Sequence, residues 1–211
     1  MRAPLAAGVV LAGGRSRRMG GVVKALLPLA GKPMIQHVID RVRPQVSELM
    51  LSVEEPARAL EFLKLEQVPD RVPGSRGPLG GLFSVLDKMD SRYDWLLLVP
   101  CDAPFVPTVL FENLLRQALA SQKPGAVVSV ATEIQPTFSI WHRSLLPDLE
   151  HAVLEEEMAG FKQFLDVRKL AVFEWPLTDI SSFFNINDQE TLDQAERLMQ
   201  PVNRTPGSCS V

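Results

Sequence analysis

The sequence is poor in cysteine, in histidine and in long apolar runs, and each scarcity excludes a class of protein. Two cysteines among 211 residues cannot form the disulfide framework of a small secreted domain, and they suit a reducing cytoplasm. The three histidines lie far apart, at no spacing typical of a metal site. No apolar run approaches the ~20 residues that a membrane span needs. Residues 1–4 lead into a strand-like run without an apolar leader, so we expect no signal peptide, no membrane contact and a cytoplasmic location.

An excess of charge of either sign is also missing. The formal net charge is −3 and the pI is about 5.7, so the protein lacks the net positive charge that is typical of proteins that bind nucleic acids. Hydrophobic residues make up 46% and charged residues 22%, which excludes a disordered chain. This length suits one α/β domain. We expect a single domain over residues 1–200 and a disordered tail over 201–211, which is small, polar and proline-bearing.

Strand-like and helix-like segments alternate along the chain. Apolar runs predict strands at 7–12, 48–53, 95–99 and 126–130, with extended segments at 135–141 and 170–175. Helical patterns cover 33–46, 56–64, 82–89, 108–120, 145–157 and 188–199. This alternation predicts a three-layer α/β fold, with a mostly parallel sheet and helices on both faces. Ligands bind beyond the carboxyl ends of such strands, so we expect the loops after Ala12, Val53 and Val99 to line one rim.

The loop that follows the first strand, residues 11–24, combines glycine with positive charge. Its four glycines let backbone N–H groups turn toward a ligand. Its positive charges come from Arg15, Arg17, Arg18 and Lys24. Such donors suit a polyphosphate, yet no Gly-Lys-Ser/Thr follows as in a Walker loop, and the chain has no Gly-x-Gly of a dinucleotide fingerprint. A basic surface loop with turn glycines is the alternative interpretation.

A carboxylate, Asp102, follows the central strand and is held between Pro100 and Pro104. This rigid position at the ligand edge favours Mg²⁺ binding, because Mg²⁺ prefers one or two carboxylates together with substrate phosphates. A helix cap or a turn is the alternative role for this residue. The neighbouring Cys101 is interpreted as a packing residue, because no histidine lies near it in sequence to activate it.

Two further loops carry polar groups that suit a ligand. Asp70 is able to accept hydrogen bonds from a sugar or base, and the loop 74–81 leads into a helix whose start could face an anion. A plain turn with a helix cap is the alternative there. Asn185 and Asn187 alternate, so we expect their side chains on one face of an extended segment, where paired amides suit a polar heterocycle or a phosphate. Asp188 is expected to cap the following helix.

Together these loops resemble the molybdenum cofactor guanylyltransferases, nucleotidyltransferases with a glycosyltransferase-A-like fold. The matching segments, in order across residues 7–198, are Leu11-Ala12-Gly13-Gly14, Arg18-Met19-Gly20 with Lys24, Leu29-Ala30-Gly31-Lys32-Pro33, Asp70 with Gly77-Pro78-Leu79-Gly80-Gly81, Pro100-Cys101-Asp102-Ala103-Pro104, and Asn185-Ile186-Asn187. The resemblance implies transfer of GMP from GTP to the terminal phosphate of molybdopterin that carries molybdenum, with release of pyrophosphate. The Leu-Ala-Gly-Gly form looks like the guanine-using branch, since cytidylyl-using relatives tend to read Leu-Ala-Ala-Gly.

The same resemblance implies a role for each site residue. The roles are guanine contact by the backbone of Leu11, Ala12 and Gly13, nucleotide binding by Gly14, Arg15 and Asp70, triphosphate binding and catalysis by Lys24 and Arg18, Mg²⁺ binding and catalysis by Asp102, and contact with the pterin by Asn185 and Asn187. Mg²⁺ is the implied cofactor, and GTP and molybdenum-bearing molybdopterin are the implied substrates. Molybdoenzymes or other cofactor-biosynthesis proteins are further implied partners.

Two positions depart from the family pattern. Val23 precedes Lys24 where the family usually has an acidic residue, which removes a charge balance or hydrogen bond at that position. Ser52 lies near the end of the second strand, where the family often has Asn, and replaces an amide contact only in part. Three alternatives therefore stay open: a cytidylyl- or sugar-phosphate-using nucleotidyltransferase, a non-catalytic protein that binds GTP or the cofactor for delivery, and a purely structural α/β module.

Overall fold

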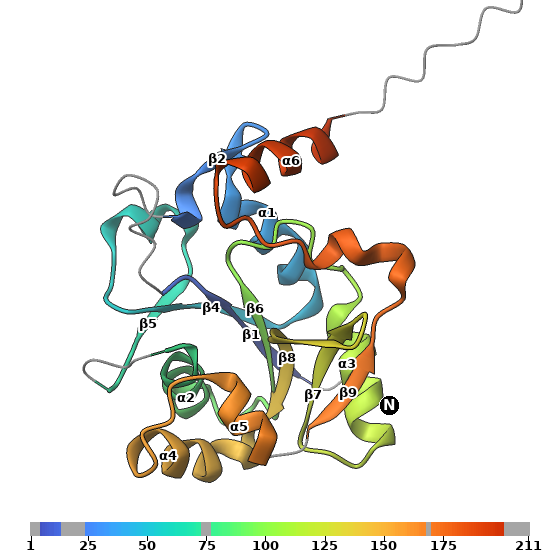
Figure 1. Cartoon of the computed structure of the whole chain (residues 1–211). Helices are drawn as coiled ribbons and strands as arrows, with labels where there is room; N and C mark the ends of the chain where they lie inside the picture. Colours follow the sequence, from blue (N-terminus) through green and yellow to red (C-terminus); the bar gives the residue numbers. More distant parts are fainter. Residues whose placement is uncertain (1–4, 14–23, 73–76, 168–169, 201–211) are drawn as a thin grey trace, which may run out of the picture.

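The computed structural model describes residues 5–13, 24–72, 77–167 and 170–200, which form a central sheet between two layers of helices (Figure 1). Within these residues, a seven-stranded sheet has the order β5-β4-β1-β6-β8-β7-β9, and β2 and β3 form a separate pair. The strands are β1 (Ala6–Leu11), β2 (Pro28–Leu29), β3 (Lys32–Pro33), β4 (Glu48–Val53), β5 (Glu66–Pro69), β6 (Trp95–Pro100), β7 (Gly125–Val130), β8 (Glu133–His142) and β9 (Ala171–Glu174). Neighbouring strands of the large sheet pair in parallel, except that β8 runs antiparallel to β6 and β7. The prediction of a mostly parallel α/β sheet is confirmed.

The central strands are apolar along their whole length because helices cover both faces of the sheet. The first face is covered by α1 (Met34–Val42) and α3 (Leu110–Ala120), and the second by α2 (Pro78–Lys88), α4 (Leu146–Leu154) and α5 (Phe161–Val167). In β6, Leu97 and Val99 pack on the first face, while Leu96 and Leu98 pack on the second. Alternate residues of a strand point to opposite faces, so both sets must be apolar. Figure 1 shows α2, α4 and α5 lying together on one side of the sheet.

Several boundaries differ from the sequence-based expectations. The helix expected at 82–89 begins one turn earlier, at Pro78, because proline is well suited to the first turn of a helix. The short helix expected at 56–64 is a 3-10 helix, η4 (Arg58–Leu63). The pattern missed β5, in which Val68 alone is fully buried, and it also missed α5 and the β2-β3 pair. The other 3-10 helices among the described residues are η2 (Lys24–Leu26), η3 (Arg43–Gln45), η5 (Arg143–Leu145) and η6 (Leu177–Phe183).

The tail over 201–211 lies outside the described residues, and the expectation of disorder there stays a prediction. Among the helices that the structure describes, none combines the length and the apolar character needed to cross a membrane.

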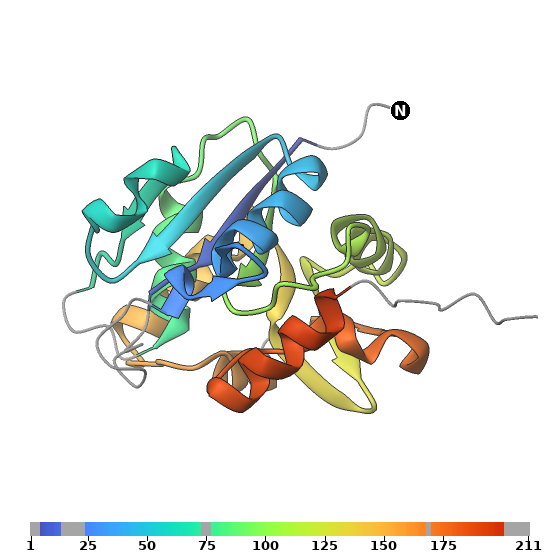
Figure 2. The same ribbon diagram turned by 90° about the horizontal axis from the view of Figure 1, so that it is seen from above.

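The last helix that the structure describes, α6 (Gln189–Met199), contacts β2 and lies outside the seven-stranded sheet (Figure 2). Its apolar residues Leu192 and Ala195 pack against Leu29 and Ile186 in a small separate core. As expected, Asp188 caps the helix: its carboxylate accepts a hydrogen bond from the N–H of Thr191 (2.9 Å). This cap fixes the start of α6 directly after Asn187, so it also helps to hold that residue in place.

Replacing Asp188 with Ala is expected to lower the melting temperature, because the N–H of Thr191 loses its acceptor. Hydrogen bonds from the backbone and side chain of Thr191 lower the pKa of the Asp188 carboxyl below its ordinary value. A depressed carboxyl pKa stabilises the folded state above the unfolded pKa, and this stabilisation is lost as the pH falls through the folded value. Thermal melts should therefore show the largest difference near neutral pH and a shrinking one in strong acid.

Glu196→Ala, on an exposed turn of the same helix, is the matched control and should melt like the parent protein at each pH. A melting temperature for Asp188→Ala equal to that of the control at neutral pH would contradict the assigned cap.

Candidate functional site

The carboxyl ends of β1, β4 and β6 meet at one edge of the sheet. In the parallel register, Leu11 lies beside both Ser52 and Pro100. The N–H of Ala12 donates to the Ser52 carbonyl (2.9 Å), and the N–H of Cys101 donates to the Leu11 carbonyl (3.1 Å). The loops that follow these strands therefore start side by side, and the expected common rim is confirmed.

Lys24, Asp102 and Asn187 make contact at this edge, and we call these three residues the rim cluster. The Nζ of Lys24 forms an ion pair with Oδ2 of Asp102 and donates to Oδ1 of Asn187 at 2.9 Å. The side chains of Lys24 and Asp102 are only 15% and 18% exposed, so water and salt screen their attraction weakly. Lys24 and Asp102 are 78 residues apart in the chain, and the structure places them together as a shared triphosphate site requires.

The segment with both asparagines is fixed against the loop of Asp102. The N–H of Ile186 donates to the backbone carbonyl of Asp102 (2.9 Å). Asn187 accepts from Lys24, whereas Oδ1 of Asn185 is buried and has no hydrogen-bond partner in the part of the chain that the structure describes. Because buried polar atoms are normally satisfied, this amide oxygen is an acceptor available to a substrate donor or a cation.

Asp70 lies at the same edge, where the start of α2 comes very close to β4. The N–H of Asp70 donates to the carbonyl of Val53 (3.1 Å). A Cβ added to Gly81 would lie 2.5 Å from Oγ of Ser52 and 3.3 Å from Oδ1 of Asp70. A side chain at this position would displace the Ser52 hydroxyl, so Gly81 allows the first turns of α2 to pack against both polar side chains. Sequence reasoning assigned this glycine to a loop and missed its packing role.

The backbone expected to contact guanine is described only as far as Gly13. The N–H of Ala12 is already used within the sheet, whereas Gly13 is exposed and has no hydrogen bond to the described residues. A Cβ on Gly13 would lie 3.1 Å from the backbone N of Glu54, so this turn passes close to the end of β4. The rest of the cationic loop, including Gly14, Arg15 and Arg18, lies outside the described residues.

Comparison with known proteins shows the family to which the chain belongs. The model of the MobA-like NTP transferase domain matches residues 8–172. The chain belongs to this family. The molybdenum cofactor guanylyltransferase of Bradyrhizobium sp. (strain ORS 278) is 36% identical over 201 residues, which cover 93% of this chain and 94% of that protein. The corresponding guanylyltransferase of Rhodopseudomonas palustris (strain BisB5) is 36% identical over 199 residues, covering 92% and 94% of the two chains.

A solved structure shows the same fold. The molybdopterin-guanine dinucleotide biosynthesis protein A of Archaeoglobus fulgidus superposes with a TM-score of 0.73 at 22% identity, over 91% of this chain and 97% of that one. The resemblance seen in the sequence motifs is therefore confirmed at the level of the family and of the fold. The family model and the relatives show that the chain is a MobA-like nucleotidyltransferase.

Residue 23 is Val where the family usually has an acidic residue, and another residue supplies the negative charge beside Lys24. Val23 itself lies outside the described residues. The negative charge that balances Lys24 comes from Asp102, which reaches it from the end of β6. Sequence reasoning placed both residues at one edge but did not foresee their direct pairing, since no local pattern signals a contact across 78 residues.

Cys101 lies beside Asp102 but is not equipped to act as a nucleophile. Its side chain is buried, and burial together with the charge of Asp102 raises the pKa of the thiol to about 12. The reactive form of cysteine is the thiolate, which is nearly absent at neutral pH when the pKa is so high. The interpretation of Cys101 as a packing residue is confirmed.

The second cysteine of the sequence, Cys209, is replaced by Ser so that Cys101 is the only thiol. The native Cys209→Ser protein is expected to resist a thiol-specific reagent at mildly alkaline pH. The same protein in denaturant should react with one equivalent of reagent, because unfolding exposes the Cys101 thiol and restores an ordinary pKa. Absorbance of the released chromophore measures both reactions. Fast labelling of the native protein at Cys101 would show that this side chain is reached from the rim, contrary to its observed burial.

Proposed function

We propose that this chain transfers GMP from GTP to the terminal phosphate of molybdopterin that carries molybdenum, and that it releases pyrophosphate. The observation that carries the proposal is the rim cluster, in which Lys24, Asp102 and Asn187 converge at the strand ends from three distant parts of the chain. A cation, a carboxylate and an amide at one edge suit a triphosphate with its metal. The names of the relatives support guanine as the base and molybdopterin as the acceptor.

The donor nucleotide is assigned to the side of the rim where β1, β4 and α2 converge. We assign guanine contact to the backbone of Leu11, Ala12 and Gly13, and nucleoside contact to Asp70. The close packing of Gly81 against Ser52 and Asp70 supports this assignment, because it creates a fixed polar wall beside the β1 turn. The triphosphate is assigned to Lys24, together with Gly14, Arg15 and Arg18 of the loop outside the described residues.

The residues of the rim fit Mg²⁺ bound together with a nucleotide. Among the described residues, no group of three or more His, Cys, Asp and Glu could hold a metal alone. The carboxylate of Asp102 nevertheless supplies a hard oxygen ligand at the rim, and substrate phosphates complete such sites. When bound there, Mg²⁺ would neutralise charge on the phosphates.

The chemistry requires no general base from the protein. The acceptor is a phosphate monoester, whose second pKa of ~6 leaves it largely anionic at neutral pH. One of its oxygens attacks the α-phosphorus of GTP, the bond from that phosphorus to the bridging oxygen breaks, and pyrophosphate leaves with the electron pair. Lys24 holds the triphosphate in line and stabilises the charge that builds on the leaving group.

The acceptor is assigned to the side of the rim formed by Asn185 and Asn187. The contact between the N–H of Ile186 and the carbonyl of Asp102 supports this assignment, because it holds both amides next to the donor site. We place the reaction in the cytoplasm, where reduced thiols persist. Molybdoenzymes or other cofactor-biosynthesis proteins would receive the product.

A pyrophosphate-release assay with purified protein, Mg²⁺ and molybdenum-loaded molybdopterin tests the proposal. We expect GTP to support release, and CTP, ATP and UTP to give little, with a dinucleotide product identified by its mass. A reaction without acceptor is the control for simple GTP hydrolysis. Release with CTP in place of GTP would instead favour the cytidylyl-using relative. Binding of GTP without release, in the presence of acceptor and Mg²⁺, would favour a delivery protein and overturn the proposed transfer.

A further inference from the structure

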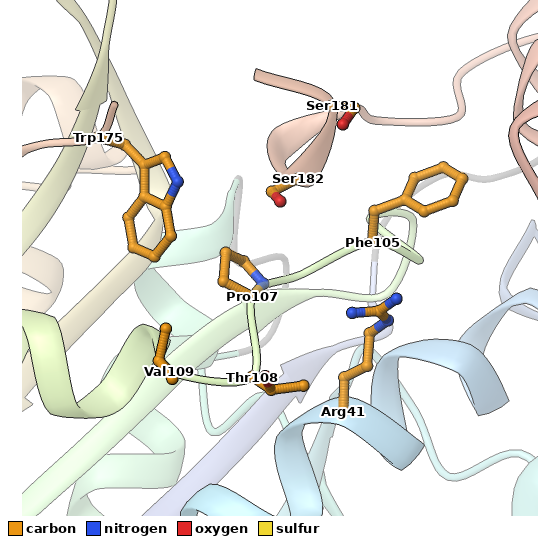
Figure 3. A pocket seen from close by; sticks show the side chains of 8 residues that line it. All are labelled: Arg41, Phe105, Pro107, Thr108, Val109, Trp175, Ser181 and Ser182. Atoms are coloured by element: carbon orange, nitrogen blue, oxygen red, sulfur yellow. The ribbon is translucent and has the colours of Figure 1, made fainter. Parts of the chain in front are cut away.

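A pocket of about 350 Å³ lies on the side of α1 and α3 and contains no residue of the rim cluster (Figure 3). Its walls come from α1, from the loop 105–109 that precedes α3, and from the stretch between the end of β9 and the end of η6. This volume falls within the range of about 300–1,000 Å³ that is usual for small-molecule sites. The pocket is therefore large enough for a ligand of its own.

Arg41 brings a positive charge into this pocket, and none of the side chains that the structure describes in its walls is acidic. The Arg41 side chain is half-buried, and the contact described for its guanidinium is a long one, from Nη1 to the carbonyl of Val106 at 3.5 Å. Within the described residues, Arg41 forms no ion pair. Figure 3 shows the guanidinium extending from α1 toward Phe105. Because a guanidinium has five N–H donors and the structure describes one long contact for it, most of this binding capacity is available to an anion.

Trp175 lies in the opposite wall. Its side chain is buried, and Phe173 and Phe183 hold its ring edge-on, with ring centroids 5.6 and 5.1 Å away. These contacts fix the indole in one orientation, so this wall of the pocket is rigid. The hydroxyl of Ser181 lies on the same side of the pocket and adds a polar group there (Figure 3).

We propose that this pocket binds a small molecule that carries a phosphate or carboxylate group. The anionic group pairs with the fork of Arg41, which suits two oxygens at once. A neutral molecule of the same shape offers the guanidinium no charged partner. The proposal goes beyond the transfer reaction, because the pocket residues take no part in the rim cluster.

Titration of the purified, full-length protein with phenyl phosphate and with benzoate tests the proposal, with benzyl alcohol as the neutral probe. The indole N–H signals of the three tryptophans, Trp95, Trp141 and Trp175, report binding by nuclear magnetic resonance. We expect the Trp175 signal to shift and saturate with at least one anionic probe in the millimolar range. Trp141 lies in the core and donates to Ser139, so its signal should stay in place. The stronger of the two anionic probes identifies the preferred group.

Arg41→Gln should weaken binding of the anionic probe at least about tenfold, since hydrogen bonds to charged groups are the strong ones. Arg43→Gln removes an exposed guanidinium two residues away and should bind like the parent protein. An unshifted Trp141 signal shows that each variant is folded. The proposal is overturned if Trp175 responds to neither anionic probe, if benzyl alcohol binds as well as both, or if Arg41→Gln binds as tightly as Arg43→Gln.

Discussion

Replacing Asp102 with Asn should lower kcat for pyrophosphate release at least about tenfold, which corresponds to roughly 1.4 kcal/mol of transition-state stabilisation. The amide keeps the size of the side chain but removes the negative charge that faces Lys24. We also expect half-maximal activity to need more Mg²⁺, because an amide oxygen binds the ion more weakly than a carboxylate does. Steady-state kinetics over a range of Mg²⁺ concentrations measures both effects.

The substitution leaves the architecture of the rim in place. The backbone carbonyl of Asp102 still accepts from the N–H of Ile186, so the asparagine segment stays attached. Asp193→Asn, on the exposed face of α6, makes the same chemical change outside the rim and should retain full activity. If a folded Asp102→Asn enzyme turned over like this control with an unchanged need for Mg²⁺, Asp102 would have no part in metal binding or catalysis.

The sequence predicted those parts of the fold that a regular pattern encodes. The strands 48–53, 95–99 and 126–130 stand within one residue of the observed β4, β6 and β7, because a strand covered on both faces must be apolar throughout. The common rim followed in turn, since parallel strands bring their carboxyl ends to one edge. The same rule predicted that Asp102 and the loop of Lys24 lie at one edge of the sheet.

The parts that were missed depend on contacts between distant segments. β5 is four residues long and completes the sheet by pairing with β4, so no apolar period marks it. Gly81 was assigned to a loop because glycine is common in turns. It lies instead in α2, where its missing side chain makes room for Ser52 and Asp70. The pocket of Arg41 joins three separate segments and has no sequence motif at all.

Replacing Lys24 with Met should affect the nucleotide rather than the metal. We expect kcat to fall at least about tenfold and KM for GTP to rise, because the side chain keeps its length but loses the charge that neutralises the triphosphate. The need for Mg²⁺ should not rise, and this is the opposite of the result expected for Asp102→Asn. The reason is the ion pair: without Lys24, no ammonium competes with Mg²⁺ for the carboxylate of Asp102. Kinetics with GTP and Mg²⁺ varied independently separates the two variants.

Lys88→Met is the matched control, because Lys88 is an exposed lysine at the end of α2, paired with Glu66, and should be dispensable for activity. Lys24→Arg keeps the charge and should restore part of the affinity for GTP, although its planar fork replaces a compact ammonium. A raised need for Mg²⁺ in Lys24→Met would mean that Lys24 acts by positioning Asp102 and not by binding phosphate. An unchanged KM for GTP in a folded, inactive variant would support the same positioning role, so the two kinetic constants together decide what Lys24 does at the rim.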